Sequence, residues 1–256
     1  MRLAAQLIEN FYVRAKNPIG LDEIQLGLVE INKLKPEDVA SSNAPVLMTR
    51  RSELHGRTPR QIAYLQQIQD HDITFGIGPA GTGKSYCAGA LAAEELEARR
   101  IDRIIISRPA IEAGESMGFL PGTLHEKFDP YFDAFRDCLN ERLGRGAVDC
   151  GLKNGRIVVS PLAYLRGKTF NDAFVVLDEA QNCTRSQLKM FLTRIGENCR
   201  VVVNGDIKQS DIGHHSGLQD AIDRLRGVAS VYVHEFSRDD IVRSGLVKDI
   251  LIRYED

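Results

Sequence analysis

Residues 76–85 read GIGPAGTGKS and directly follow the short apolar run DITF. The stretch has few side chains and much bare backbone. Glycine adopts positive φ at little cost, so successive N–H groups in such a loop turn inward and form a nest that holds an anion. The pattern G-x-x-x-x-G-K-[ST] is met at Gly78, Gly83, Lys84 and Ser85. The stretch therefore predicts a strand, a phosphate-binding loop and a helix, in that order.

Each part of this loop has an expected task. The N-terminus of the following helix places a positive dipole end beneath the phosphates. Lys84 is expected to reach the β- and γ-phosphates and the Ser85 hydroxyl to bind Mg²⁺, so ATP and Mg²⁺ are the expected cofactors. A flexible glycine-rich turn with a chance lysine is the alternative, and the flanking strand and helix argue against it. The residues expected to bind the nucleotide here are Gly78, Pro79, Ala80, Gly81, Thr82, Gly83, Lys84 and Ser85.

From residue 60 onward, short β-branched runs alternate with helical stretches. Runs that are apolar throughout are typical of strands buried on both faces of a parallel sheet. We therefore expect an α/β fold, a P-loop NTPase with a mostly parallel sheet covered by helices on both faces. The runs are DITFGI, RIIIS, GRIVVS, AFVVLD, CRVVVNGD and ASVYVHEF. Helices are expected near residues 84–99, 124–143, 184–195, 215–226 and 240–251.

The chain divides into two expected parts. Residues 1–57 carry mixed signals, with a short helix at 3–13, a strand in LVEINKL and a basic irregular stretch, TRRSELHGRTP, and form a small N-terminal element without an assigned role. Residues 58–256 form the nucleotide-binding domain. Within it, residues 110–155 are too many for a simple crossover and are expected to insert extra helices.

The composition limits which classes of protein and partner the sequence allows. The chain has 256 residues, 43% hydrophobic and 27% charged, as in ordinary soluble proteins. A net charge of -2 gives no whole-chain attraction to nucleic acid, so any such site has to be a local basic patch. The five cysteines form no C-x-x-C pair and are expected as buried free thiols. No stretch approaches the roughly 20 apolar residues of a membrane span, so we expect a cytoplasmic protein without a membrane partner.

The segment FVVLDEAQN places two adjacent carboxylates after an apolar strand. Asp178 falls at the carboxyl end of that strand, the edge where open α/β sheets place their sites. It suits Mg²⁺ binding together with Ser85, and Glu179 suits polarising an attacking water. Adjacent carboxylates are also common in solvated turns, but here a buried strand delivers them to the expected edge.

Further polar residues follow other strands or precede the loop. The segment VVVNGDIKQ ends a strand expected between the P-loop strand and the strand before Asp178. Asn204 is a candidate sensor of the γ-phosphate and Gln209 a candidate catalytic residue, although an Asn-Gly turn capped by Asp206 explains the same pattern. Gln61, in RTPRQ, is either a contact for the adenine edge or an ordinary residue of a helix surface.

Hydrolysis usually needs a cation on the γ-phosphate beyond the P-loop lysine. Arg243, in DDIVRSGLV, is the first candidate and Arg238 the second. Either is also explained as a surface arginine.

Taken together, these residues resemble the PhoH-type (phosphate-starvation-inducible) P-loop ATPases from about residue 61 to residue 254. The resemblance implies a RecA- or helicase-like core with an RNA-related role. The family's usual Val-Arg-His-Pro reads Val-Arg-Ser-Gly from Val242 to Gly245, which keeps the arginine and changes its setting. The segments that carry the resemblance are GPAGTGKS, SRPAIEAGESMGFLPGTLHEKFDPYFDAF, LAYLRGKTFNDAFVVLDEAQN, QLKMFLTRIGEN, VVNGDIKQSD and DDIVRSGLV.

Two partner classes stay open. The first is RNA or another single-stranded nucleic acid, because Arg108, Arg166 and Lys168 follow strands or loops near the predicted sheet edge and suit phosphate contacts. Nearby aromatic residues suit stacking on bases, although aromatics at helical spacing are more often core. The second is a nucleotide-driven protein switch or chaperone, which the near-neutral net charge favours slightly. The aromatics are Phe119, Phe128, Tyr131, Phe132, Phe135, Tyr164 and Phe170.

The last expectation concerns assembly. Helicases of the resembled superfamily close the ATP site with a second core in the same chain, whereas this sequence shows one P-loop and one Asp-Glu pair at the end of an apolar strand. A head-to-tail homo-oligomer, expected as a hexameric ring, would let each neighbour cover the next site. Arg243 would then act in cis or in trans, and Arg108, Arg166 and Arg194 are other candidate donors.

Overall fold

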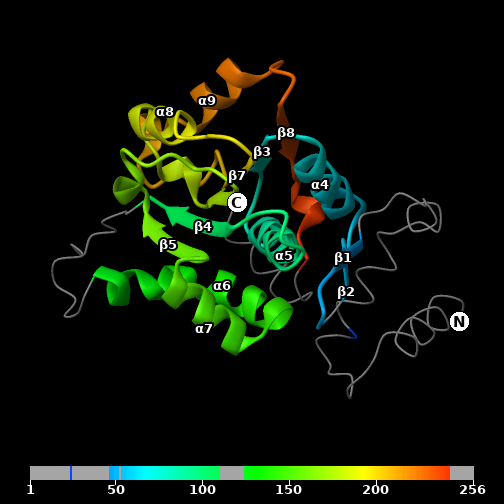
Figure 1. Cartoon of the computed structure of the whole chain (residues 1–256). Coiled ribbons are helices and arrows are strands. Elements are labelled where there is room, and N and C mark those ends of the chain that lie inside the picture. Colours follow the sequence, from blue (N-terminus) through cyan, green and yellow to red (C-terminus); the bar gives the residue numbers. More distant parts are fainter. Residues whose placement is uncertain (1–23, 25–45, 52, 110–123, 243–256) are drawn as a thin grey trace, which may run out of the picture.

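The computed structural model describes residue 24 and residues 46–51, 53–109 and 124–242 (Figure 1). Within this part of the chain, a six-stranded sheet has helices packed on both of its faces. No helix in these ranges is both long and apolar enough to cross a bilayer. The strands of the large sheet are β3 (Ile73–Ile77), β4 (Arg103–Arg108), β5 (Ile157–Pro161), β6 (Ala173–Leu177), β7 (Cys199–Gly205) and β8 (Val231–Glu235).

The strand order is β5-β4-β6-β7-β3-β8, and all neighbouring strands pair in parallel. The predicted strands and the parallel sheet are confirmed. Strand β7 lies between β3 and β6, as expected, with Gly76 opposite Asn204 and Val175 opposite Val201. Parallel strands all end at one edge of the sheet, so the residues after β3, β6 and β7 come together there.

Alternating side chains of the strands feed two separate cores. Phe174 and Val176 face the core formed with the helices that follow the P-loop, whereas Val175 and Leu177 face the opposite core. Because strands β4 to β7 contribute to both cores, their apolar runs are continuous. In Figure 1, α6 and α7 lie on one side of the sheet and α8 and α9 on the other. The helices are α4 (Pro59–Asp70), α5 (Lys84–Glu97), α6 (Leu124–Leu143), α7 (Arg145–Asn154), α8 (Arg185–Leu192) and α9 (Leu218–Leu225).

The helix boundaries follow from local sequence. Thr58 caps α4 by accepting a hydrogen bond from the Gln61 N–H, and Pro59 occupies the first turn, where its missing N–H has no consequence. Thr184 and Gln187 form a reciprocal capping box at the start of α8. Helices α6 and α7 confirm that the described part of the insertion is helical. Of the helix expected over 240–251, residues 243–251 lie outside the described residues, and a short 3-10 turn, η5 (Arg238–Asp240), precedes them.

The basic stretch before residue 58 is not irregular throughout, which corrects the expectation for TRRSELHGRTP. Strand β2 (Glu53–His55) pairs antiparallel with β1 (Val46–Met48) in a small hairpin. Backbone N–H groups of this hairpin bind helix α5, since Met48 donates to Glu94 (3.2 Å) and Arg50 to Glu97 (2.7 Å). The other expectations for residues 1–45 fall outside the described residues. Three further 3-10 turns are η2 (Leu162–Leu165), η3 (Ala180–Asn182) and η4 (Gly213–His215).

The five cysteines are all free, and three of them are buried. Burial raises the pKa of the Cys87 and Cys183 thiols to about 12 and that of Cys199 to about 11. These groups are protonated and unreactive at neutral pH. Cys150 is exposed, so the expectation of buried thiols is confirmed for Cys87, Cys138 and Cys183 but not for this residue.

Candidate nucleotide site

A pocket of about 260 Å³ lies at the carboxyl edge of the sheet, where β3, β6 and β7 end. It gathers the P-loop and the two adjacent carboxylates predicted from the sequence, together with the residues that follow β7. The lining residues are Gly78, Ala80, Gly81, Gly83, Lys84, Ser85, Tyr86, Asp178, Glu179, Gln181, Gly205, Asp206 and Gln209.

Two glycines of the loop are required by close contacts as well as by backbone angle. Gly78 has φ 143°, and a Cβ there would lie 2.5 Å from the Phe236 carbonyl oxygen. Gly83 has φ 84°, and a Cβ there would lie 2.5 Å from the Gln61 side-chain nitrogen. Side chains at these positions would be strained and would push neighbouring groups away. The loop therefore keeps the bare backbone that an anion site needs.

Lys84 lies inside the loop. Its Nζ donates to the carbonyl oxygens of Gly78 (2.7 Å) and Pro79 (2.8 Å). Burial lowers the pKa of its amino group, while the carboxylates of Asp206, Asp178 and Glu179 act in the opposite direction. The ammonium group thus lies at the mouth of the phosphate nest, with acidic groups around it.

Asp178 is almost fully buried, with 3% of its surface exposed, and both of its oxygens accept hydrogen bonds. The Ser85 hydroxyl donates to Oδ1 at 2.9 Å. Arg108 donates to Oδ2 through Nε at 3.0 Å and also through Nη2. A hydroxyl and a carboxylate in contact beside a phosphate nest are the donor set that Mg²⁺ takes in P-loop proteins, so these residues fit the metal.

Arg108 occupies a different place from the one expected of a nucleic-acid contact. It ends strand β4, and its half-buried side chain forms an ion pair with Asp178. The charge of a buried carboxylate requires such a partner. The structure therefore places this arginine on the nucleotide side of the sheet edge, and its contact with nucleic acid stays a prediction.

Glu179 is exposed to the pocket and has an unusual backbone conformation, with φ 56°. Non-glycine residues in the left-handed region carry strain, which clusters at functional sites. Gln181 is buried and donates to the Glu179 carboxylate at 2.6 Å, and its own oxygen accepts the Asp206 N–H at 3.1 Å. Gln181 thus joins the carboxylate to the end of β7, a role that was not predicted from the sequence.

Asn204 does not line the pocket, which corrects its expected role as a γ-phosphate sensor. It is fully buried, and its Oδ1 accepts a hydrogen bond from the Tyr64 hydroxyl of α4 at 2.5 Å. The alternation of side chains along β7 turns Asn204 towards α4, whereas the next residues, Gly205 and Asp206, reach the pocket. Gln209 lines the pocket as expected, and its N–H donates to the Asp206 carbonyl oxygen at 3.1 Å.

Gln61 lies behind the loop and is buried. Its side-chain nitrogen donates to the Thr82 carbonyl oxygen at 2.9 Å, and its side-chain oxygen accepts the Arg57 N–H at 2.9 Å. The side chain therefore holds the loop from the side of α4. The adenine contact stays a prediction.

Arg243 lies outside the described residues. The residue before it, Val242, donates its N–H to the Gly81 carbonyl oxygen at 2.9 Å. The chain thus arrives beside the P-loop directly before the first candidate arginine. Arg238, the second candidate, belongs to η5, which follows β8.

The other basic candidates lie in the loop after β5 and η2. Arg166 and Lys168 are exposed, and between them Gly167 has φ 80°. Tyr164 is 55% exposed, whereas Phe170 is 1% exposed and belongs to the core. Of the other aromatics expected to stack on bases, Phe132 and Phe135 are core as well, and Phe119, Phe128 and Tyr131 fall outside the residues whose side chains are described.

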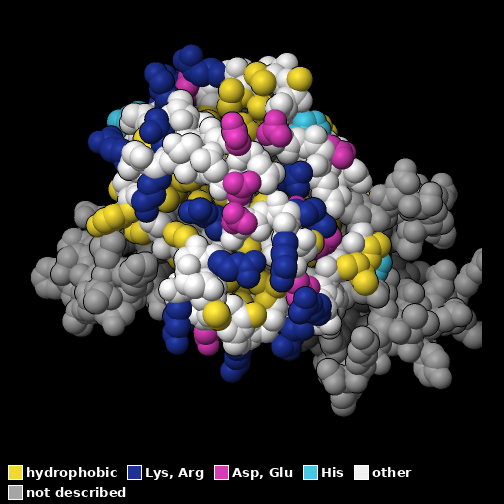
Figure 2. All heavy atoms as spheres, viewed as in Figure 1, with side chains coloured by type: hydrophobic (Ala, Val, Ile, Leu, Met, Phe, Trp, Pro, Cys, Tyr) yellow, Lys and Arg dark blue, Asp and Glu magenta, His cyan; other side chains and the backbone are white. Residues whose placement is uncertain are grey.

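Figure 2 shows Lys and Arg side chains distributed over one face of the molecule and a short row of Asp and Glu side chains near its centre. No single sign of charge covers this face. On this face, any nucleic-acid site is therefore restricted to local groups, as the net charge of -2 also implies.

Tyr86 lines the pocket and was also not predicted from the sequence. Its position directly after Ser85 was a signal, because the first residues of the helix that follows a P-loop face the nucleotide. The contact of Gln181 with Asp206 and that of Tyr86 with Glu141 join segments 25 and 55 residues apart and left no local signal.

Relatives of known family match most of the chain. The model of the PhoH-like protein family matches residues 53–255. A PhoH-like protein of Mycobacterium leprae (strain TN) is 46% identical over 249 residues, which are 95% of this chain and 71% of that protein. A PhoH-like protein of Bacillus subtilis (strain 168) is 45% identical over 78% of this chain and 63% of its own length. Protein PhoH of Escherichia coli (strain K12) is 42% identical over 90% of this chain and 64% of its own length.

Solved structures show weaker similarity. The UvsW helicase from bacteriophage T4 matches with a TM-score of 0.45 and 14% identity, over 93% of this chain and 77% of that chain. The SWI2/SNF2 ATPase core of Sulfolobus solfataricus, in complex with dsDNA, matches with a TM-score of 0.43 and 14% identity. The match covers 70% of this chain and 44% of that chain. These scores add nothing to the sheet order and loop geometry described above.

Proposed function

The chain belongs to the PhoH family, and from this premise we propose that it hydrolyses ATP with Mg²⁺ and couples hydrolysis to binding or remodelling of single-stranded RNA. Family and fold make it a nucleotide-binding protein of the P-loop type. The chain spans about two thirds of the length of its relatives in E. coli and B. subtilis, so the activity of those whole proteins is not assumed for it.

The contact between Ser85 and Asp178 is the observation that carries the proposal. It joins the P-loop to the end of β6 at 2.9 Å, with Glu179 as the next residue along the chain. Mg²⁺, when bound, supplies positive charge beside the phosphates. Lys84 adds a second positive charge from the loop, and Glu179, held by Gln181, accepts a proton from water. Binding and hydrolysis thus have separate residues, which makes them separable by mutation.

The RNA part of the proposal is supported by the loop after β5. This loop lies at the same edge of the sheet as the pocket, because β4 and β5 run parallel to the strands that carry the pocket. Two exposed cations, Arg166 and Lys168, flank a glycine, and an exposed aromatic ring, Tyr164, precedes them. Cations for the backbone and a ring for a base are the elements of sequence-independent binding to single strands.

A ring-shaped assembly is also part of the proposal. An ATP site that stays in contact with water stabilises developing charge only weakly. A neighbouring copy that covered the pocket would exclude water and bring in an arginine. Light scattering with Mg²⁺ and ATP is expected to show a closed oligomer, with six subunits as the expected number. A monomer with full ATPase activity at nanomolar concentration would contradict this part.

The ATPase rate with and without single-stranded RNA tests the whole proposal. We expect hydrolysis to require Mg²⁺ and its rate to increase on addition of single-stranded RNA. The increase should be smaller with a duplex of the same length. Hydrolysis that no nucleic acid changes would favour a protein switch or chaperone. A lack of any hydrolysis, with and without RNA, would contradict the proposal itself.

A further inference from the structure

The pocket described above has clear ligands for phosphate and metal but few for the rest of a nucleotide. Most of its lining residues are glycines, one alanine and groups that carry charge or an amide. Among the described residues that line it, Tyr86 has the one aromatic ring. A nucleobase has a flat face that stacks on aromatic rings irrespective of its hydrogen-bonding pattern.

Tyr86 is held in place from outside the pocket. Its hydroxyl donates to both carboxylate oxygens of Glu141, at 3.0 and 2.9 Å. Glu141 belongs to α6, in the helical insertion, and does not itself line the nucleotide pocket. Burial and the Glu141 carboxylate raise the pKa of the phenol, so it stays protonated and keeps donating at neutral pH.

Helix α6 is itself tightly fixed on α5. The backbone approaches closely at Gly89, where a Cβ would lie 3.3 Å from both Cys138 and Phe135. The Cys138 thiol also lies 3.5 Å from the Tyr86 carbonyl oxygen. The ring of Tyr86 is half-buried and packs against this core. Its orientation is therefore set by packing and by its hydroxyl before any ligand enters, which lowers the entropic cost of binding.

We propose that Tyr86 binds the base of the nucleotide and that Glu141 positions its ring. This inference rests on the proposed function, because it assumes that the P-loop holds the phosphates. It assigns the helical insertion a part in nucleotide recognition. It also makes the P-loop helix supply both ends of the site, with Lys84 for phosphate and Tyr86 for base.

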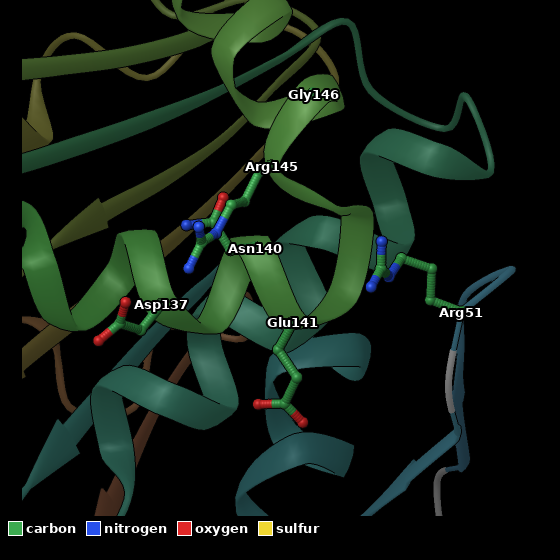
Figure 3. A pocket seen from close by; sticks show the side chains of 6 residues that line it. All are labelled: Arg51, Asp137, Asn140, Glu141, Arg145 and Gly146. Carbon is green, nitrogen blue, oxygen red and sulfur yellow. The ribbon is translucent and has the colours of Figure 1, made fainter.

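Glu141 also connects the site with a second hollow, of about 580 Å³, between the hairpin and helices α6 and α7. Figure 3 shows Arg51 reaching this hollow from the hairpin and Arg145 from α7, with Glu141 on the helix between them. Asp137, on the preceding turn of α6, lines the same hollow and takes no part in the two bonds to Tyr86. It provides a matched control for Glu141.

The test compares a nucleotide with an inorganic polyphosphate that has neither ribose nor base. Binding of ADP and of inorganic tripolyphosphate, each with Mg²⁺, is measured by calorimetry. Tyr86→Ala is expected to weaken ADP binding about tenfold to 100-fold and to leave tripolyphosphate binding within about twofold. Tyr86→Phe keeps the ring but loses the bond to Glu141, so Tyr86→Phe and Glu141→Ala are each expected to weaken ADP binding about three- to tenfold and to leave tripolyphosphate binding unchanged. Glu141→Gln keeps an acceptor and is expected to restore most of that loss, and Asp137→Ala to match the unaltered protein.

A second measurement uses the absence of tryptophan from the chain. Tyr86→Trp introduces a single indole whose fluorescence is expected to change with ADP and not with tripolyphosphate. Equal losses for both ligands in Tyr86→Ala, or unchanged ADP binding, would overturn the inference. If the unaltered protein bound neither ligand, the proposed function would fail, a result distinct from a loss of discrimination between the two.

Discussion

The two halves of the sheet's carboxyl edge are built in different ways. At the half formed by β3, β6 and β7, functional side chains bind one another, as Ser85 binds Asp178 and Gln181 binds Glu179. At the half formed by β4 and β5, Arg166 and Lys168 extend into solvent. Preorganised groups act strongly on a ligand, whereas each exposed charge contributes little and is screened by salt. Substitutions in the first half should therefore have larger effects than those in the second.

Loss of the P-loop cation should have the largest effect. Lys84→Ala is expected to reduce ATP hydrolysis below detection and to weaken nucleotide binding by about tenfold or more, because the charge that faces the phosphates is removed. Steady-state turnover and calorimetry measure the two effects. Lys189→Ala, on the exposed face of α8, is the control and should change neither.

The next largest effect separates binding from hydrolysis. Glu179→Gln keeps the shape of the side chain and its bond with Gln181 but removes the base, so turnover should fall by about 10²-fold while ATP affinity stays the same. Glu197→Gln, at an exposed position, is the matched control. Turnover at the unaltered rate would show that Glu179 does not activate the water.

Arg108 lies on the boundary between the two halves and should have an intermediate effect. Arg108→Ala leaves the buried Asp178 carboxylate without its cation, and turnover should fall about tenfold. Arg108→Lys keeps the charge but cannot make the two-pronged ion pair, so recovery should be partial. Arg103→Ala, at the exposed opposite end of β4, is the control and should have no effect. Normal turnover in Arg108→Ala would show that Arg108 does not support the nucleotide site and would favour a role in nucleic-acid binding.

The smallest effect is expected in the solvent-exposed half. The double variant Arg166→Ala, Lys168→Ala should weaken single-stranded RNA binding several-fold, with ATP affinity unchanged. The salt slope should become shallower by about 0.7 for each RNA phosphate that the variant no longer neutralises. Arg145→Ala with Lys153→Ala removes the same charges from α7 and is the control. An unchanged slope would exclude this loop from RNA binding.

Much of the first half of this edge was predictable because its signals are local. A glycine pattern between a strand and a helix predicts its own position at the carboxyl edge of the sheet, and so does an apolar run that ends in Asp178. The direction of Asn204 was not predictable, since both faces of a parallel strand are buried and its apolar run does not show which face carries the site. Pairings such as Arg108 with Asp178, 70 residues apart, follow from strand order, which local pattern does not specify.

The contacts that hold the P-loop determine when, during synthesis of the chain, the loop can bind nucleotide. Gly78 packs against Phe236, and the Gly81 carbonyl oxygen accepts the N–H of Val242, about 160 residues later in the chain. A ribosome-bound fragment ending at residue 230 would contain the whole glycine motif and Asp178, yet lack both supports. Because contacts at such sequence separation close late in folding, the loop reaches its final shape only after residues 236–242 have been synthesised. A nascent chain would then be unable to retain nucleotide until strand β8 and the residues directly after it have been added.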